Sequence, residues 1–251
     1  TWRILSFIEG QTIHSIQESN IASEAGRLVG EFHSAFWNYK HDWVSPRRNI
    51  HNTPERMADL EKALERADGH HLETPARKLG EQILKDWTNW TGTLDLPTHL
   101  CHGDLKISNL RFDQQGRGLC LIDLDTLGEA DFSVEMGDAW RSWCNPAGEA
   151  APEAVRFDQE IFRVSARSWL KELPQISQTE KEALVPGIER ICLELSARFC
   201  ADAINNNYFK EDRACYPVIG AHNLTRAKTQ YLLSKSIARQ RAACEQVIFS
   251  S

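Results

Sequence analysis

The amino-acid sequence predicts an α+β protein that is mainly helical and carries one short β-hairpin. Apolar residues recur at intervals of three and four through most of the chain, most clearly over residues 20–37. Two strand-like runs, 108–112 and 118–124, flank the turn-forming residues 113–116, and this pattern predicts the hairpin. Of the 251 residues, 41% are hydrophobic, which is enough to bury a substantial core in one large domain or two small ones.

The N-terminal third of the chain is predicted to hold one strand and three helices. Thr53 and Thr74 each precede a proline, so each offers a hydroxyl that can cap the start of a helix. The polar and aromatic segment 38–52 lies between two of these helices, and we expect an ordered loop near a site mouth or a surface excursion. The predicted elements are a strand at 1–8, which alternates polar and apolar residues in part, and helices at 20–37, 54–67 and 75–90.

The sequence after residue 129 has a helical pattern throughout. One helix is expected to begin after Ser177, because Ser177 and Glu180 have the spacing of a capping box. Internal repeats and low-complexity stretches are absent from the sequence. The other predicted helices of this half lie at 133–144, 152–173 and 222–248.

Charge and cysteine usage exclude several classes of protein. The formal net charge is −6 and the pI is near 5.9, so nothing in the composition favours a nucleic acid or an anionic membrane as partner. The seven cysteines are scattered singly, which favours free thiols in a reducing cytoplasm over disulfides or a zinc site. The sequence contains no apolar run long enough for a membrane span and no signal-peptide pattern, so we expect a cytoplasmic protein.

The residues with the clearest chemical meaning lie in two short motifs. The first is H-G-D-x-x-x-x-N at 102–109, and the second is I-D-L-D at 122–125. Phosphoryl transfer uses one Asp to accept the proton of an attacking hydroxyl, an Asn to hold a metal ion, and another Asp to hold the metals on the nucleotide phosphates. Asp104, Asn109 and Asp123 can fill these three roles. The competing interpretation is a His-Gly turn followed by two capped strand ends.

These two motifs, together with G-D-A-W-R at 137–141, resemble the aminoglycoside phosphotransferase and choline kinase superfamily. Within this superfamily, the run L-I-D-L-D-T at 121–126 and the late segment H-N-L-T-R-A-K-T-Q at 222–230 are most similar to bacterial N-acetylhexosamine 1-kinases. The resemblance covers nearly the whole chain. Its first two motifs are specific for the superfamily, whereas the late segment only suggests the sugar-kinase branch.

The resemblance implies a protein-kinase-like fold, of which this chain is expected to be the large C-terminal lobe. Residues 1–10 would form the strand between the lobes, and 11–251 the helical phosphotransferase lobe with its catalytic loop at 100–126. Kinases of this type begin with a small lobe that carries a phosphate-covering loop and a Lys. The sequence contains no G-x-G-x-x-G, and its first Lys is Lys40, so we expect this N-terminal lobe to be absent. The uncovered face between the lobes would then invite self-association.

The resemblance also implies ATP and Mg²⁺ as cofactors and a small hydroxylated substrate, with an amino sugar such as an N-acetylhexosamine as the first choice. Asp104 is the candidate base, and Lys106 can neutralise charge on the transferred phosphoryl group. Asn109 and Asp123 are candidate Mg²⁺ ligands, and Asp125 would face the same side as Asp123 on a strand. Aminoglycoside, choline and homoserine kinases remain alternatives, as does a truncated module that binds a nucleotide or a partner without catalysis.

The remaining candidate residues support or surround the reaction. Structural interpretations stay open beside several functional ones: a solvated loop residue for Lys106, a strand-end cap for Asp125, and a surface ion pair for Arg141. Aromatic packing is likewise open for the segment around Tyr208. By resemblance, the backbone of Ser6, Phe7 and Ile8 would contact the nucleobase, Arg141, Tyr208 and Arg213 the substrate, and His102 and Asp138 would support the catalytic loop, Asp138 by bracing its backbone.

Overall fold

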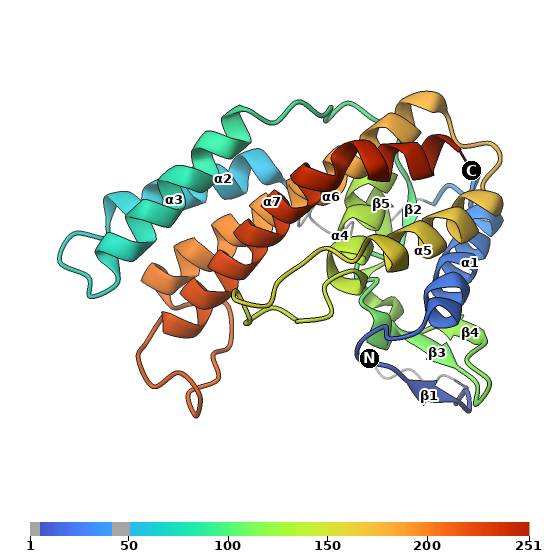
Figure 1. The fold of residues 1–251 in the computed structure, drawn as a ribbon, viewed down its shortest axis with the longest axis horizontal. Coiled ribbons are helices and arrows are strands. Elements are labelled where there is room, and N and C mark those ends of the chain that lie inside the picture. The colour runs from blue at the N-terminus through green and yellow to red at the C-terminus, as the bar shows by residue number, and fades with distance from the viewer. Residues whose placement is uncertain (1–5, 42–50, 251) are drawn as a thin grey trace.

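The computed structural model describes residues 6–41 and 51–250, and these form a mainly helical protein with two small sheets (Figure 1). The helices are α1 (Ser19–Ala35), α2 (Thr53–Glu65), α3 (Glu73–Thr88), α4 (Phe132–Trp143), α5 (Gln159–Lys171), α6 (Gln178–Asn205) and α7 (Ala221–Phe249). The strands are β1 (Gln11–Thr12), β2 (His99–Cys101), β3 (Leu110–Phe112), β4 (Gly118–Leu121) and β5 (Gly128–Ala130). The predicted fold class, mainly helical α+β, is confirmed.

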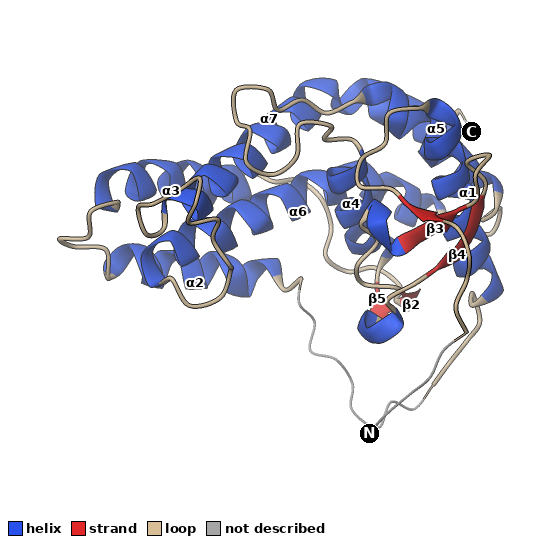
Figure 2. Ribbon diagram, turned by 90° about the horizontal axis from the view of Figure 1, so that it is seen from below, coloured by secondary structure: helices blue, strands red, loops and turns tan. Residues whose placement is uncertain are grey.

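The long helices α6 and α7 pack side by side along the molecule, with α2 and α3 at one end and the three-stranded sheet near the other (Figures 1 and 2). One core cluster lies at the sheet end and contains Trp140, Trp143 and Trp169; a second lies among α2, α3 and α6. Helices α4 and α6 cross closely, because a Cβ at Gly187 would meet the carbonyl oxygen of Ser133 at 2.3 Å. The central helix α4 is thereby fixed against both the core and α6.

The predicted hairpin is present, and its strands are shorter than expected. Strands β3 and β4 pair antiparallel with Leu110 opposite Leu121, and β1 adds a third strand on the other side of β3. A second sheet pairs β2 with β5, with Leu100 opposite Glu129. Its strands of three residues are too short to show a period in the sequence. The H-G-D-x-x-x-x-N motif, 102–109, connects the two sheets, since it follows β2 and leads into β3.

Three predictions about element ends are wrong. Strand character at 6–8 is absent, while the rest of the predicted strand 1–8 lies outside the described residues. The helix predicted at 152–173 begins only at Gln159, because the side chain of Asp158 caps it by accepting the N–H of Glu160 and of Ile161. Neither Thr53 nor Thr74 caps its helix: each lies inside it.

The capping box at Ser177 is confirmed, since Ser177 Oγ accepts the N–H of Glu180, and the Glu180 carboxylate accepts the N–H of Ser177. Most of the loop predicted at 38–52 lies outside the described residues. Within the described residues, no helix combines the length and the apolar character that crossing a membrane requires.

Candidate active site

The H-G-D-x-x-x-x-N motif forms a loop, residues 102–109, between β2 and β3. Leu105 and Ile107 are buried and attach the loop to the core. The indole Nε1 of Trp143, on α4, donates a hydrogen bond of 2.7 Å to the carbonyl oxygen of Leu105. These contacts attach the centre of the loop to the core and to α4, while the side chain of Asp104 keeps 30% of its surface exposed.

This loop brings three of the predicted site residues together. Nζ of Lys106 lies 2.7 Å from Oδ2 of Asp104. Nδ2 of Asn109 donates to the main-chain carbonyl of Asp104 at 2.8 Å and to its Oδ2 at 3.1 Å. The carboxylate of Asp104 is thus oriented by a cation and an amide and is still accessible to a substrate hydroxyl, as a catalytic base must be.

Three hydrogen bonds hold the I-D-L-D motif beside this loop. Ile122 donates its N–H to the carbonyl of Asn109 at 2.8 Å. Nε2 of His102 donates to the carbonyl of Ile122 at 2.9 Å, and Oγ1 of Thr126 donates to the carbonyl of His102 at 2.6 Å. Asp123 is exposed and directly follows Ile122, so it lies at the same end of the hairpin as Asn109.

The backbone of Asp123 adopts the left-handed conformation, with φ 63° and ψ 52°. This conformation costs a non-glycine residue about 1 kcal/mol or more and is enriched at functional sites. The chain leaves β4 at Leu121, so Asp125 lies on a 3₁₀ helix, Leu124–Thr126. The argument that Asp125 shares a strand face with Asp123 is therefore wrong, and a metal role for Asp125 stays a prediction.

The oxygen atoms at this site fit a hard cation. Since Nδ2 of Asn109 donates to Asp104, its Oδ1 is the atom left for a metal ion. Asp123 adds an exposed carboxylate a short distance along the hairpin. Mg²⁺ prefers such oxygen ligands and keeps several of its waters. Asn109 and Asp123 are therefore the residues of this chain that would hold it.

A second group with metal-binding spacing, His33, Cys101 and Glu135, is buried next to the loop, with ligand atoms within 4.8 Å of one another. Nδ1 of His33 accepts the indole N–H of Trp169 at 3.0 Å, so Nε2 carries the proton and faces Oε1 of Glu135 at 3.4 Å. Burial lowers the pKa of His33 and raises the pKa of the Cys101 thiol well above its usual value. The contacts describe a hydrogen-bonded core cluster.

Glu135, on α4, is a supporting residue that the sequence analysis missed. Its Oε1 accepts the N–H of His102 at 2.7 Å, and its Oε2 accepts the N–H of Gly103 at 2.9 Å. His102 is buried and Gly103 is half-buried, so Glu135 supplies acceptors for N–H groups with little access to water and fixes the start of the loop. The sequence signal that could have identified Glu135 is its place on the same apolar helix face as Phe132 and Met136. A charged residue on a buried face needs buried partners.

The bracing role predicted for Asp138 belongs to Glu135 instead. The carboxylate of Asp138 accepts two hydrogen bonds from Arg141, at 3.1 Å from Nε and 2.9 Å from Nη2. Burial raises the pKa of Asp138, but the charges of Arg141 and His51 outweigh it, so the pKa is lowered overall. Asp138 is therefore ionised, and its carboxylate holds the guanidinium of Arg141 in place.

The predicted surface ion pair of Arg141 is in fact buried, since the residue is only 8% exposed. Its guanidinium also pairs with Glu149 at 3.2 Å, and Glu149 pairs with Arg226 of α7 at 2.6 Å. The ring of Phe199 lies 3.8 Å below the guanidinium of Arg226. This network ties α4 to α7 through the loop that carries Glu149, and it engages all three nitrogens of the Arg141 guanidinium.

Both ring nitrogens of His102 are engaged. Its Nδ1 accepts the N–H of Asp104 at 3.3 Å, while Nε2 donates to Ile122. This pattern of one accepting and one donating nitrogen places a proton on Nε2. Such a ring links the catalytic loop to the segment before Asp123, which is the structural role that the sequence predicts for His102.

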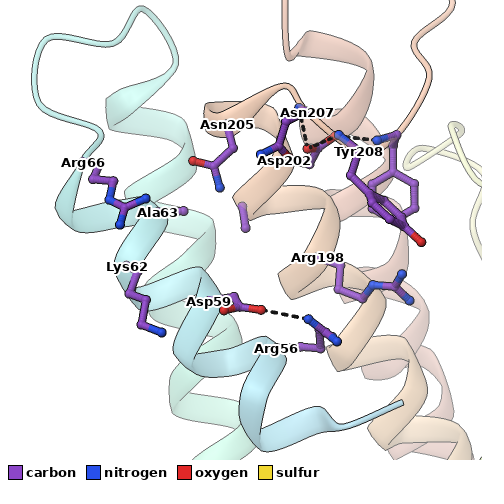
Figure 3. Close-up of a pocket in the computed structure, with 12 residues that line it drawn as sticks. Arg56, Asp59, Lys62, Ala63, Arg66, Arg198, Asp202, Asn205, Asn207 and Tyr208 are labelled. Atoms are coloured by element: carbon purple, nitrogen blue, oxygen red, sulfur yellow. Dashed lines mark hydrogen bonds and ion pairs between the residues drawn. The ribbon is translucent and has the colours of Figure 1, made fainter. Parts of the chain in front are cut away.

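The predicted substrate residues Tyr208 and Arg213 follow α6. Tyr208 is 69% exposed and lines a pocket of about 400 Å³ between α2 and α6 (Figure 3). No residue of the loop 102–109 lines this pocket. Arg213 forms an ion pair with Glu211 at 2.9 Å. No hydrogen bond or ion pair among the described residues joins either residue to the loop 102–109, and their substrate roles stay predictions.

The predicted nucleobase contacts, Ser6, Phe7 and Ile8, form an extended segment before β1. The ring of Phe7 is 85% exposed. The carbonyl of Ile8 accepts a hydrogen bond from Nη2 of Arg111 at 3.2 Å, which attaches the segment to β3. The backbone role of the three residues is not tested by these contacts.

Gly103 supplies a conformation that other residues adopt poorly. Its φ is +78°, and a Cβ there would meet the carbonyl oxygen of Thr126 at 2.6 Å. We expect Gly103→Ala to lower the free energy of unfolding by about 2–4 kcal/mol, from backbone strain together with displacement of the loop from Thr126. Urea unfolding measures this change.

Gly69 offers a matched control, because its φ is +74° and nothing lies within 4 Å of the added Cβ. Gly69→Ala should cost only the backbone strain, about 1 kcal/mol. Equal losses for the two variants would show that the contact between Gly103 and Thr126 is not tight.

Comparisons with known proteins agree with this geometry. The family model described as the phosphotransferase enzyme family matches residues 1–173. No curated protein matches the sequence. A solved structure from Ralstonia eutropha JMP134, provisionally described as an aminoglycoside phosphotransferase, is 12% identical with a TM-score of 0.56. That match covers 91% of this chain and 71% of the other.

Two further solved structures show the same likeness. Choline kinase from Cryptosporidium parvum Iowa II is 13% identical with a TM-score of 0.55, and the match covers 97% of this chain and 73% of that one. Amicoumacin kinase in complex with AMP-PNP, Ca²⁺ and Ami is 13% identical with a TM-score of 0.51. The match covers 96% of this chain and 63% of the amicoumacin kinase. These likenesses confirm the predicted protein-kinase-like fold.

Proposed function

Because the chain belongs to the phosphotransferase enzyme family, we propose that it transfers the γ-phosphoryl group of ATP to a hydroxyl of a small molecule. The observation that carries this proposal is the hydrogen-bonded group of Asp104, Lys106 and Asn109, held beside the segment that leads to Asp123. We further propose an amino sugar such as an N-acetylhexosamine as acceptor, on the resemblance of the segments 121–126 and 222–230.

Asp104 would orient the acceptor hydroxyl and accept its proton at Oδ1 or Oδ2. Asn109 already donates to Oδ2, so the carboxylate is held in one orientation before the substrate arrives. Because the transition state of phosphoryl transfer is loose, this positioning contributes as much as basicity. Lys106 pairs with the same oxygen at 2.7 Å and would offset negative charge at the moment of transfer.

Nucleotide and metal binding are part of the same proposal. When bound, Mg²⁺ would supply positive charge that offsets the charge of the nucleotide phosphates. Asn109 and Asp123 would hold it, with Asp125 as a further candidate ligand. The complex of amicoumacin kinase with AMP-PNP and Ca²⁺ supports a nucleotide and a divalent cation for this fold. Residues 1–10 are proposed as the segment between two lobes, with 11–251 as the larger lobe.

Acceptor contacts have less support than the catalytic loop. The guanidinium of Arg141 is paired with Asp138 and Glu149, so its proposed role is to keep α4 and the loop that carries Glu149 rigid beside the site. Tyr208 and Arg213 are kept as proposed contacts because a phenol ring suits the face of a sugar and a guanidinium suits its hydroxyls. The free thiols of all seven cysteines support the proposed cytoplasmic location, whereas self-association stays a prediction.

An acceptor panel tests the proposed function. The full-length gene product is incubated with ATP, Mg²⁺ and one acceptor at a time: N-acetylglucosamine, N-acetylgalactosamine, an aminoglycoside, choline or homoserine. We expect Mg²⁺-dependent release of ADP with an N-acetylhexosamine. Faster turnover of another acceptor would keep the kinase and overturn the sugar. If a folded protein turns over none of them, the non-catalytic binding module becomes the better account.

Substitution of Asp123 tests the metal site. Asp123→Asn preserves the left-handed backbone, because Asn tolerates this conformation, and it removes the negative charge from the metal ligand. We expect the Mg²⁺ concentration for half-maximal activity to rise by at least about tenfold. Asp125→Asn is the comparison: a similar rise would identify a second ligand, and no change would leave Asp125 outside the metal site. An unchanged Mg²⁺ requirement in Asp123→Asn would contradict the assignment.

A further inference from the structure

A pocket of about 400 Å³ lies between α2 and the C-terminal end of α6, apart from the catalytic loop (Figure 3). Its lining includes four cationic side chains: Arg56 and Lys62 from α2, Arg66 directly after α2, and Arg198 from α6. Tyr208 and Phe209, on the turn after α6, add aromatic rings to the lining.

Only two carboxylates line this pocket, and both are engaged. Asp202 is 4% exposed and accepts the backbone N–H groups of the turn that follows α6, together with Nδ2 of Asn223. Asp59 pairs with Nη1 of Arg56 at 2.9 Å. Among the described residues, no ion pair is recorded for Lys62, Arg66 or Arg198. The pocket therefore has an excess of positive charge that its own residues leave unbalanced.

Two of the cations are held in defined positions. The guanidinium of Arg198 lies over the rings of Tyr208 and Phe209, with its central carbon 5.5 and 5.4 Å from their centroids. Arg56 is fixed by Asp59, and its buried Nε–H has no acceptor within the part of the chain that the structure describes. Both guanidinium groups therefore hold fixed positions in the lining of the pocket.

We propose that this pocket, lined by Arg56, Arg66 and Arg198, binds a small anion that carries phosphate groups. Guanidinium groups donate two parallel hydrogen bonds to phosphate oxygens, and the pocket is lined by one such group from each helix, Arg56 of α2 and Arg198 of α6 (Figure 3). Lys62 and Arg66, both exposed, add charge at the rim. Four cations favour a multiply charged anion over a single carboxylate. The proposal does not depend on the proposed kinase function.

Calorimetric titration with inorganic pyrophosphate tests this site in the full chain, with EDTA present to exclude bound metals. We expect saturable binding that weakens as the salt concentration rises. Arg198→Gln should weaken binding by about tenfold or more, the effect of losing one charge-assisted hydrogen bond. Lys171→Gln is the matched control, since Lys171 is exposed on α5 and its loss removes the same charge away from the pocket.

Two further arms separate this site from others. Asp123→Asn should leave pyrophosphate binding unchanged, because the catalytic loop does not line the pocket. Citrate should bind more weakly than pyrophosphate. The proposal is overturned if no saturable binding occurs, if Arg198→Gln and Lys171→Gln bind alike, or if citrate binds more tightly. Circular dichroism and thermal melting of each variant confirm that it is folded before its affinity is compared.

Discussion

Replacement of Asp104 by Asn should lower kcat by about a hundred- to ten-thousandfold, the range of a general base. The substitution keeps the shape of the side chain and removes the carboxylate that accepts a proton. It also removes the ion pair with Lys106 and places an amide where Nδ2 of Asn109 now donates. Because Asp104 is 30% exposed in its side chain and its backbone contacts are untouched, the fold should persist. Initial rates at saturating ATP and acceptor measure the effect.

The changes in kcat and in nucleotide affinity of Asp104→Asn, taken together, separate a catalytic role of Asp104 from a structural one. Loss of a base lowers kcat and leaves the affinity for nucleotide within a fewfold, whereas a collapsed loop weakens both. Asp95→Asn, in the exposed loop before β2, is the control for a change of the same chemistry elsewhere. An Asp104→Asn enzyme with near-normal kcat would exclude Asp104 as the base.

Glu135→Ala should give the largest loss of stability among the residues near the site. The change removes the acceptors of the N–H groups of His102, which is buried, and Gly103, which is half-buried, and a buried N–H without an acceptor costs about 1–3 kcal/mol. It also removes the partner of Nε2 of His33, a residue whose Nδ1 accepts the indole N–H of Trp169. We expect the free energy of unfolding to fall by about 3–5 kcal/mol. Urea denaturation provides the measurement.

Activity should fall in parallel, because the same two hydrogen bonds set the start of the catalytic loop. Glu135→Gln is the informative intermediate: its carbonyl can accept one N–H, while its amide meets the other donor. It should therefore lose about half as much stability as Glu135→Ala. Glu129→Gln, in the exposed part of β5, is the control for a changed Glu nearby. Wild-type stability in Glu135→Ala would contradict the bracing role.

The sequence was most informative where chemistry is encoded by fixed spacing. Asp104 and Asn109 were identifiable because both lie in one motif of fixed spacing, H-G-D-x-x-x-x-N, whose residue types match the needs of phosphoryl transfer. The long helices were also predictable, since their buried faces repeat at helical intervals. The protein-kinase-like fold came from the resemblance rather than from periodicity, and the structural comparisons confirm it.

The errors arose where a tertiary contact decides the local structure. The chain turns at Asp123 into a left-handed conformation that no strand pattern reveals, so Asp125 left the predicted strand face. Glu135 and Asp138 are both acids on α4, and only the fold shows which one meets the backbone of the loop. The hydroxyl of Thr53 donates to Glu194 at 2.6 Å, a partner far along the chain, and does not cap α2.

The central claim is that Asn109 and Asp123 form a divalent-metal site beside Asp104. Titration of the isotope-labelled chain with Mn²⁺, followed by NMR, tests it most directly, because the paramagnetic ion broadens only nearby amide signals. We predict selective broadening at residues 104–109 and 122–126, reversal by excess Mg²⁺, and loss of both in Asp123→Asn. Broadening confined to other surfaces, or an unchanged pattern in Asp123→Asn, would contradict the proposed site.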